Sequence, residues 1–188
     1  HRFDAALAAD SGLAVAHLGA GITRIRQKEM NGGREHIQTA VGLDPGNSLY
    51  RSYLGKAYYE EKNSYAAGRE LATAKELAAS DPTPWLYNAI LLQNENRPVE
   101  ALDDLMQSIA LNDNRGVYRS QLLLDQDRAV RSANLAAVYR EAGMTPVGFQ
   151  EASRAVNDDY ANHSAHLFLA GIYDAQRDPK QINLRYET

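Results

Sequence analysis

Small side chains recur along this sequence at intervals of 34 residues, with bulkier apolar residues between them. Small residues at fixed places allow two helix backbones to approach closely, which is typical of repeated helical hairpins. The pattern therefore predicts three two-helix repeats, over residues 14–47, 48–81 and 82–115. Numbered from the first residue of each repeat, the small residues occupy positions 8, 20 and 27: Gly21, Gly33 and Ala40, then Gly55, Ala67 and Ala74, then Ala89, Ala101 and Ser108.

The phase of this pattern breaks after Arg115 and returns at Ala129. A fourth repeat is expected over residues 129–162, with Ala136, Gly148 and Ala155 at the three small positions. Residues 116–128 are then an insert, for which there are two interpretations. One is an apolar strap across the repeats, with Asp125 or Asp127 capping the next helix. The other is a lengthened helix that only changes the pitch of the superhelix.

Both ends of the chain are expected to fall inside a repeat. Residues 1–13 are interpreted as the end of a preceding repeat, and residues 163–188 as a partial repeat whose second helix starts at Pro179. The last residues also fit a strand, because apolar side chains alternate there at Ile182, Leu184 and Tyr186. A chain that begins with His1 rather than Met is expected to be a processed chain, an excised domain or a window of a longer protein.

The stretch from Ser48 to Asp81 resembles the tetratricopeptide repeat, because Leu54-Gly55, Tyr58, Ala67 and Ala74 stand where that family needs them. The resemblance implies an all-α fold, a right-handed α-solenoid of tetratricopeptide helical hairpins whose concave groove binds peptides. Three further segments resemble the repeat region of large Gram-negative envelope proteins that continue into an outer-membrane β-barrel: Tyr118 to Gly143, Ser164 to Ala175 and the ending DPKQINLRYET. That resemblance implies the periplasm, outer membrane or cell surface, with the cytoplasm as the alternative.

Composition narrows the function classes. The chain has 188 residues, of which 44% are hydrophobic and 23% charged, so a folded soluble domain is expected. A formal net charge of -4 without a basic cluster argues against nucleic acid as a partner. No apolar run is long enough to span a bilayer as a helix, so no membrane contact is expected of this segment itself. Zero cysteines exclude disulfides and thiolate chemistry.

No arrangement of residues indicates catalysis, a cofactor or a metal, so the protein is not expected to be an enzyme. His163 and His166 share a helix face beside Asp158 and Asp159, which is the strongest metal candidate. The preferred interpretation is packing, because position 4 of a repeat also carries a flat ring at His17 and Trp85. The phosphate-binding and nucleophile motifs of common enzyme families are absent from the sequence.

The groove is expected to be lined by positions 2, 5, 9 and 12 of the first helix of each repeat, with position 13 at its margin. The lining that this rule gives is apolar in the first repeat, which includes Leu18, and mixed in the later repeats, which include Ser52 and Thr83. Chaperone-binding members of the family hold a carboxylate with Lys and Asn, and here only Lys56 falls at a suitable place. The candidate residues for binding a peptide or protein come from the groove and the insert: Lys56, Tyr59, Ile90, Gln93, Asn94, Ala137, Arg140, Tyr118 and Arg119.

Two functions remain open from the sequence. The first is a non-enzymatic interaction scaffold that binds a peptide or protein partner in its concave groove, as a segment of a bacterial envelope protein. The second is a structural protein that assembles head to tail into homopolymers or filaments, because both terminal repeats lack a polar capping helix. Neither the partner nor the oligomeric state follows from the sequence.

Overall fold

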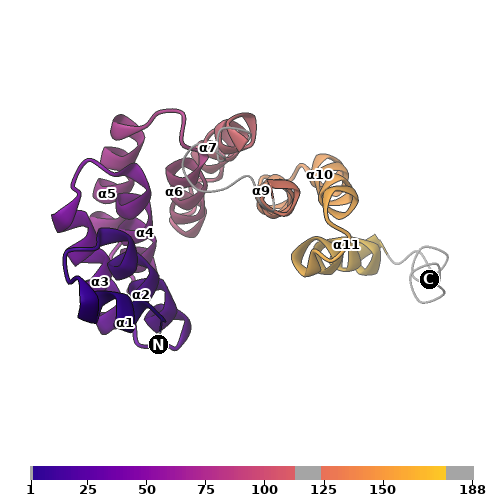
Figure 1. Cartoon of the computed structure of the whole chain (residues 1–188). Helices are drawn as coiled ribbons and strands as arrows, with labels where there is room; N and C mark the ends of the chain where they lie inside the picture. The colour runs from indigo at the N-terminus through magenta and orange to yellow at the C-terminus, as the bar shows by residue number, and fades with distance from the viewer. Residues whose placement is uncertain (1, 113–123, 177–188) are drawn as a thin grey trace. The chain divides into compact units, whose positions relative to one another are not determined.

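The computed structural model describes residues 2–112 and 124–176, and within them it contains ten α-helices and no strand (Figure 1). The predicted all-α fold is confirmed. The chain divides into two compact units, His1–Leu91 and Leu92–Thr188, and the boundary falls inside helix α6. The second helix expected at Pro179 and the alternative strand at the end of the chain lie outside the described residues.

The first unit is built from helical hairpins. α2 packs on α3, α4 packs on α5, and α3 also packs on α4, as Figure 1 shows. α2, α4 and α6 begin at the residues where the first three repeats are expected to begin. The helices, of which α6 crosses the boundary, are α1 (Arg2–Ala9), α2 (Ala14–Arg26), α3 (Met30–Leu43), α4 (Ser48–Glu60), α5 (Ser64–Leu77) and α6 (Pro82–Asn94).

The second unit contains a longer helix. α9 has 18 residues, whereas α10 has 14, because α9 begins five residues before Ala129. The last five residues of the expected insert therefore belong to a helix, so the prediction that Asp125 or Asp127 caps its start was wrong: both lie inside α9. The rest of the insert lies outside the described residues. α9 packs on α7, α10 and α11. The bounds are α7 (Pro98–Ala110), α9 (Leu124–Glu141), α10 (Thr145–Asp158) and α11 (His163–Gln176).

Glycines mark the places where paired helices approach most closely. A methyl group added at Gly21 would stand 2.7 Å from the carbonyl oxygen of Gly33, and one added at Gly33 would stand 2.8 Å from the carbonyl oxygen of Gly21. Gly148 meets the carbonyl oxygen of Ala136 in the same way, at 2.8 Å. These distances are shorter than carbon and oxygen tolerate, so positions 8 and 20 cross backbone to backbone.

The turn inside each hairpin uses a left-handed residue at position 15. The φ angles are 68° at Lys28, 63° at Lys62, 60° at Asn96 and 79° at Gly143. Such a residue ends an α-helix by reversing the twist of the backbone, and glycine adopts it with the least strain. Three of the four turns therefore place an ordinary side chain in a conformation that glycine favours.

The turn between successive hairpins is held by the side chain at position 4. In the repeats that begin at residues 14, 48, 82 and 163, a side-chain nitrogen bonds to the backbone carbonyl oxygen six residues earlier, at position 32 of the preceding repeat. His17 Nε2 lies 3.1 Å from Ser11 O, Arg51 Nε donates to Pro45 O at 2.9 Å, Trp85 Nε1 donates to Ala79 O at 3.4 Å, and His166 Nε2 lies 2.8 Å from Tyr160 O. We call this contact the turn tether. It satisfies a carbonyl at a place where the helical ladder is interrupted.

A buried carboxylate caps α6. Asp81 is fully buried, its Oδ1 accepts a hydrogen bond from the backbone nitrogen of Thr83 at 2.8 Å, and its Oδ2 accepts one from the hydroxyl of Ser48 at 3.0 Å. The same side chain thus caps the first turn of α6 and links it to the first turn of α4. Asn47 and Asn63 cap α4 and α5 in a similar way.

Candidate functional site

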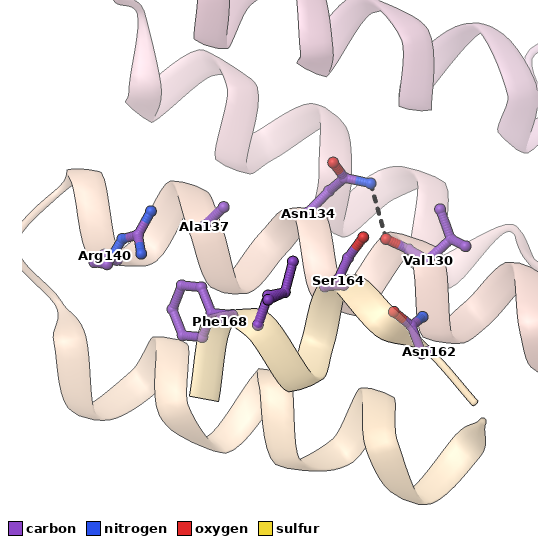
Figure 2. Close-up of a pocket in the computed structure, with 9 residues that line it drawn as sticks. Val130, Asn134, Ala137, Arg140, Asn162, Ser164 and Phe168 are labelled. Carbon is purple, nitrogen blue, oxygen red and sulfur yellow. Dashed lines mark hydrogen bonds between the residues drawn. The ribbon is translucent and has the colours of Figure 1, made fainter. Parts of the chain in front are cut away.

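A groove lies between α9 and α11 in the second unit (Figure 2). It has a volume of about 360 Å³. Five of the residues that line it come from α9, three come from α11, and one directly precedes α11. They are Val130, Ala133, Asn134, Ala137, Arg140, Asn162, Ser164, Leu167 and Phe168.

The α9 wall follows from the spacing of its residues. Val130, Ala133, Ala137 and Arg140 are three, four and three residues apart, so they lie on one face of the helix. These are positions 2, 5, 9 and 12 of the fourth repeat. Another face of α9 is covered by α10, where Gly148 meets Ala136. Asn134 completes this wall, and its side-chain amide donates to the carbonyl oxygen of Val130 at 2.8 Å.

The α11 wall is anchored by Phe168. Its ring is 7% exposed and packs with Ala136, Ala152 and Ile172 in the core of the second unit. One residue earlier, Leu167 is 58% exposed. The Phe168 side chain therefore faces the core, whereas the Leu167 side chain faces solvent. Asn162 caps α11 by accepting a hydrogen bond from the backbone nitrogen of Ala165 at 3.1 Å.

The groove carries positive charge at one side only. Arg140 is exposed, and its guanidinium carbon lies 4.9 Å from the centre of the Phe168 ring, which orients the side chain along the groove wall. None of the nine lining residues is acidic. The next residue, Glu141, accepts hydrogen bonds from Gln93 Nε2 at 3.0 Å on both carboxylate oxygens. A bound group would therefore meet apolar walls, amide and hydroxyl groups, and one cation.

Of the candidate residues expected from the sequence, the structure brings Ala137 and Arg140 together on this groove. Gln93 belongs to the same unit, but its side-chain amide is held by Glu141. Asn94, next to it in α6, is exposed. Tyr118 and Arg119 lie outside the described residues.

The remaining candidates belong to the first unit. Lys56 forms an ion pair with Glu60, one turn along α4, so its ammonium group already has a partner. Tyr59 is half-buried against the cluster of Ala67, Leu71 and Leu91, and Ile90 is half-buried in α6. Three further residues expected to line the groove are buried instead: Leu18, Ser52 and Thr83 are 7%, 0% and 1% exposed. The groove rule was wrong at these residues, at position 5 in α2 and α4 and at position 2 in α6, because their side chains are buried.

Sequence reasoning missed the α11 wall. Ser164 and Leu167 occupy positions 2 and 5 of the fifth repeat, the same positions as Val130 and Ala133 in the fourth. Applying the groove rule to this partial repeat would have found them. Phe168 and Asn134 stand at position 6, which the rule does not include, and they reach the groove beside their position 5 neighbours.

Other chemistry receives little support from the described part of the chain. It contains no group of three or more His, Asp or Glu side chains placed to hold a metal ion. His166, considered above as a ligand, makes the turn tether and an edge-to-face contact with the ring of Tyr160 at 5.3 Å. Within the same described residues, no helix combines the length and apolar character needed to cross a membrane.

Comparison with solved structures identifies the fold. The chain is similar to a chain of the APC/C hetero-tetramer Cut9-Hcn1, with a TM-score of 0.79 and 19% identity over 96% of this chain and 32% of that one. It is also similar to TTC0263, a thermophilic TPR protein of Thermus thermophilus, with a TM-score of 0.75 and 16% identity over 90% of this chain and 86% of that one. YrrB, a TPR protein with an unusual peptide-binding site, has a lower TM-score of 0.58 and 20% identity over 87% of this chain and 77% of that one.

These similarities define an all-α fold of tetratricopeptide-repeat hairpins. At identities of 20% or less they establish the fold and no particular activity. The chain spans about a third of the Cut9-Hcn1 chain that it matches. No protein-family model and no curated protein matches the sequence.

Proposed function

We propose that the chain is a non-enzymatic interaction scaffold that binds a peptide segment of a protein partner in the groove between α9 and α11. The observation that carries the proposal is the character of this groove, with apolar walls, one cation and no carboxylate among its lining residues. Apolar side chains of a peptide would bury against Val130 and Leu167, which are 46% and 58% exposed. An acidic group would pair with Arg140.

The cellular setting is a second part of the proposal. We place the chain in the bacterial envelope, as a segment of a larger periplasmic, outer-membrane or cell-surface protein. The support is the resemblance of Tyr118 to Gly143 and of Ser164 to Ala175 to repeats of such proteins. The peptide-binding site in the description of YrrB belongs to that protein, and it supports peptide binding here only through the shared fold.

A self-assembling structural protein is the alternative function. The observation that favours it is the exposure of three apolar residues in α1, α2 and the turn between them: Phe3, Leu13 and Val15 are 42%, 38% and 61% exposed. Apolar side chains grouped on a surface are characteristic of contacts between proteins. These residues would be one half of a head-to-tail contact between copies.

Selection from a display library of short random peptides tests the scaffold function. Peptides selected by the unmodified chain should combine acidic and apolar residues, and their dissociation constants can be measured by fluorescence anisotropy. Arg140→Gln removes the cation and should raise the dissociation constant by about tenfold or more, the worth of one charged hydrogen bond. Ala137→Leu should abolish binding, because Ala137 lines the groove wall and a larger side chain would fill the space.

Arg154→Gln is the matched control. Arg154 is also an exposed arginine of the second unit, but it lies on α10 and pairs with Glu151 instead of lining the groove. This variant should bind as the unmodified chain does. A double Lys56→Ala and Tyr59→Ala variant tests the first-unit candidates separately. The proposal fails if no peptide is selected, or if Ala137→Leu and Arg140→Gln both bind normally.

A further inference from the structure

Two histidines lie side by side in the first unit. His17 on α2 and His36 on α3 are 19 residues apart in sequence, but their Nδ1 atoms are 3.0 Å apart. Their ring centres are separated by 5.2 Å, and the ring planes are inclined by 38°. Both side chains are partly exposed, so solvent and ions reach the pair.

The turn tether fixes the protonation of His17. Its Nε2 atom lies 3.1 Å from the carbonyl oxygen of Ser11, which can only accept a hydrogen bond. Nε2 therefore carries the hydrogen, and in the neutral ring Nδ1 keeps a lone pair. That lone pair faces His36, whose Nδ1 must donate to it when both rings are neutral. A backbone carbonyl bonded to one ring nitrogen is also the usual partner of a histidine whose other nitrogen binds a metal.

The separation of the two nitrogens suits a shared ion. Imidazole nitrogens bind zinc at about 2.0–2.1 Å, so two of them at an angle of about 90–110° are about 2.9–3.4 Å apart. The distance of 3.0 Å falls within this range. Little movement of either helix is needed for an ion to replace the hydrogen bond, because only the ring orientations must adjust.

The equivalent positions of the next repeat carry an ion pair instead of two histidines. Arg51 stands 34 residues after His17, Glu70 stands 34 residues after His36, and Arg51 Nη1 donates to Glu70 Oε2 at 2.7 Å. Arg51 also makes the turn tether. That repeat thus joins its helices by a cation and an anion, and its carboxylate is paired with the guanidinium group. The first repeat has two imidazoles in the same two positions.

Burial and several charged groups act on the His36 ring. Burial lowers the pKa of His36, and the nearby positive charges of Arg24 and His17 lower it further. The carboxylates of Asp4 and Glu35 act in the opposite direction, by raising this pKa. Three of these groups would also act on a bound cation, which Asp4 and Glu35 would attract and Arg24 would repel.

We propose that His17 and His36 form a two-imidazole binding site for a divalent transition metal of the zinc and copper class. The two Nδ1 atoms are the ligands, and water completes the coordination. On binding, the neutral His36 ring changes tautomer, because its hydrogen moves from Nδ1 to Nε2. The charge of the protein does not change. Imidazole ligands suit Zn²⁺ and Cu²⁺ rather than Mg²⁺ or Ca²⁺. This inference is independent of the groove.

Titration with ZnCl₂, followed by isothermal calorimetry and by thermal unfolding, tests the site. The measurement uses the full chain carrying His1→Ala, because His1 is a further imidazole next to a chain terminus. One Zn²⁺ per chain should bind and raise the unfolding temperature, whereas MgCl₂ should do neither. His17→Ala and His36→Gln should each weaken Zn²⁺ binding by at least about tenfold, since even partners outside the coordination shell are worth that much.

A variant of His163 and His166 provides the control, because these two histidines lie in the second unit. His163→Gln with His166→Gln should leave the Zn²⁺ affinity unchanged. Nitrogen-15 NMR of the histidine rings gives a reading that does not depend on variants, since Zn²⁺ should shift the Nδ1 resonances of His17 and His36 together. Absence of Zn²⁺ binding overturns the proposal. So does binding that survives both substitutions, or ring resonances that do not move.

Discussion

The residues at position 4 share a bond rather than a shape. Histidine, arginine and tryptophan differ in size and charge, yet each brings a planar N–H group to the carbonyl oxygen of the preceding turn. The sequence suggested that His166 and Trp85 fill this position with a flat ring for packing. That interpretation omitted the hydrogen bond, and it could not include Arg51, which has no ring. In these four repeats the position carries a donor of suitable reach, whereas the fourth repeat has Ser132 there.

Left-handed turns offer a clean test of backbone strain. Gly143 has a φ of 79°, and no atom would lie within 4 Å of a methyl group added to it. Gly143→Ala should therefore lower the free energy of unfolding by about 1 kcal/mol, through the strain of a left-handed alanine alone. Urea denaturation followed by circular dichroism measures the change.

Gly171 is the matched control for that substitution. It lies within helix α11 of the same unit, and a methyl group added to it would also meet open space. Gly171→Ala should raise the free energy of unfolding by about 0.5–1 kcal/mol, because alanine loses less entropy than glycine in a helix. Equal effects of the two alanines would contradict the assignment of strain to the turn.

At the scale of the helices, the hairpins are set by where two backbones touch. Gly21 and Gly33 face each other across the hairpin, since a methyl group on either would collide with the backbone carbonyl oxygen of the other. A backbone carbonyl cannot move aside as a side chain can. The crossing point of α2 and α3 is therefore fixed by the absence of two side chains.

Gly21→Ala should consequently destabilise the protein more than an alanine substitution of an exposed helix glycine does. The added methyl group would also stand 2.5 Å from Ile37, which is fully buried. A loss of about 1–3 kcal/mol in the free energy of unfolding is expected from overpacking. Gly42→Ala, on the exposed side of α3 where no atom lies within 4 Å, should cost nothing or stabilise slightly. Similar urea midpoints for the two variants would contradict this account of the crossing.

The same contacts explain what the sequence could predict. Small residues at positions 8 and 20 are visible in sequence because they are tied to backbone geometry, and α2, α4 and α6 begin where that phase places them. The start of α9 was not predictable from the phase, because Leu124 to Arg128 extend the helix without adding a small contact position. The candidate site was half predicted. Arg140 follows the groove rule, whereas Phe168 reaches the groove from a neighbouring position.

At the scale of the whole molecule, the two proposed sites belong to different units. The groove is formed entirely by residues of the second unit, and the histidine pair entirely by residues of the first. Substitutions at Arg140 should therefore leave Zn²⁺ binding intact, and substitutions at His36 should leave peptide binding intact. Independent behaviour is expected because the two sites share no residues, and effects of sites without shared partners usually add.

The choice between scaffold and self-assembly depends on the mass of the particle in solution. A scaffold is expected to remain a single chain as its concentration rises, so light scattering coupled to gel filtration should give one constant mass. Val15→Lys would not change that mass. If copies associate through the exposed residues of α1 and α2, the mass should instead increase with concentration, and a lysine at position 15 should reverse the increase by placing charge in an apolar contact. If the mass increases with concentration and Val15→Lys prevents the increase, the chain is a self-assembling protein and the scaffold function is wrong. Growth that the variant leaves untouched would mean that copies meet elsewhere.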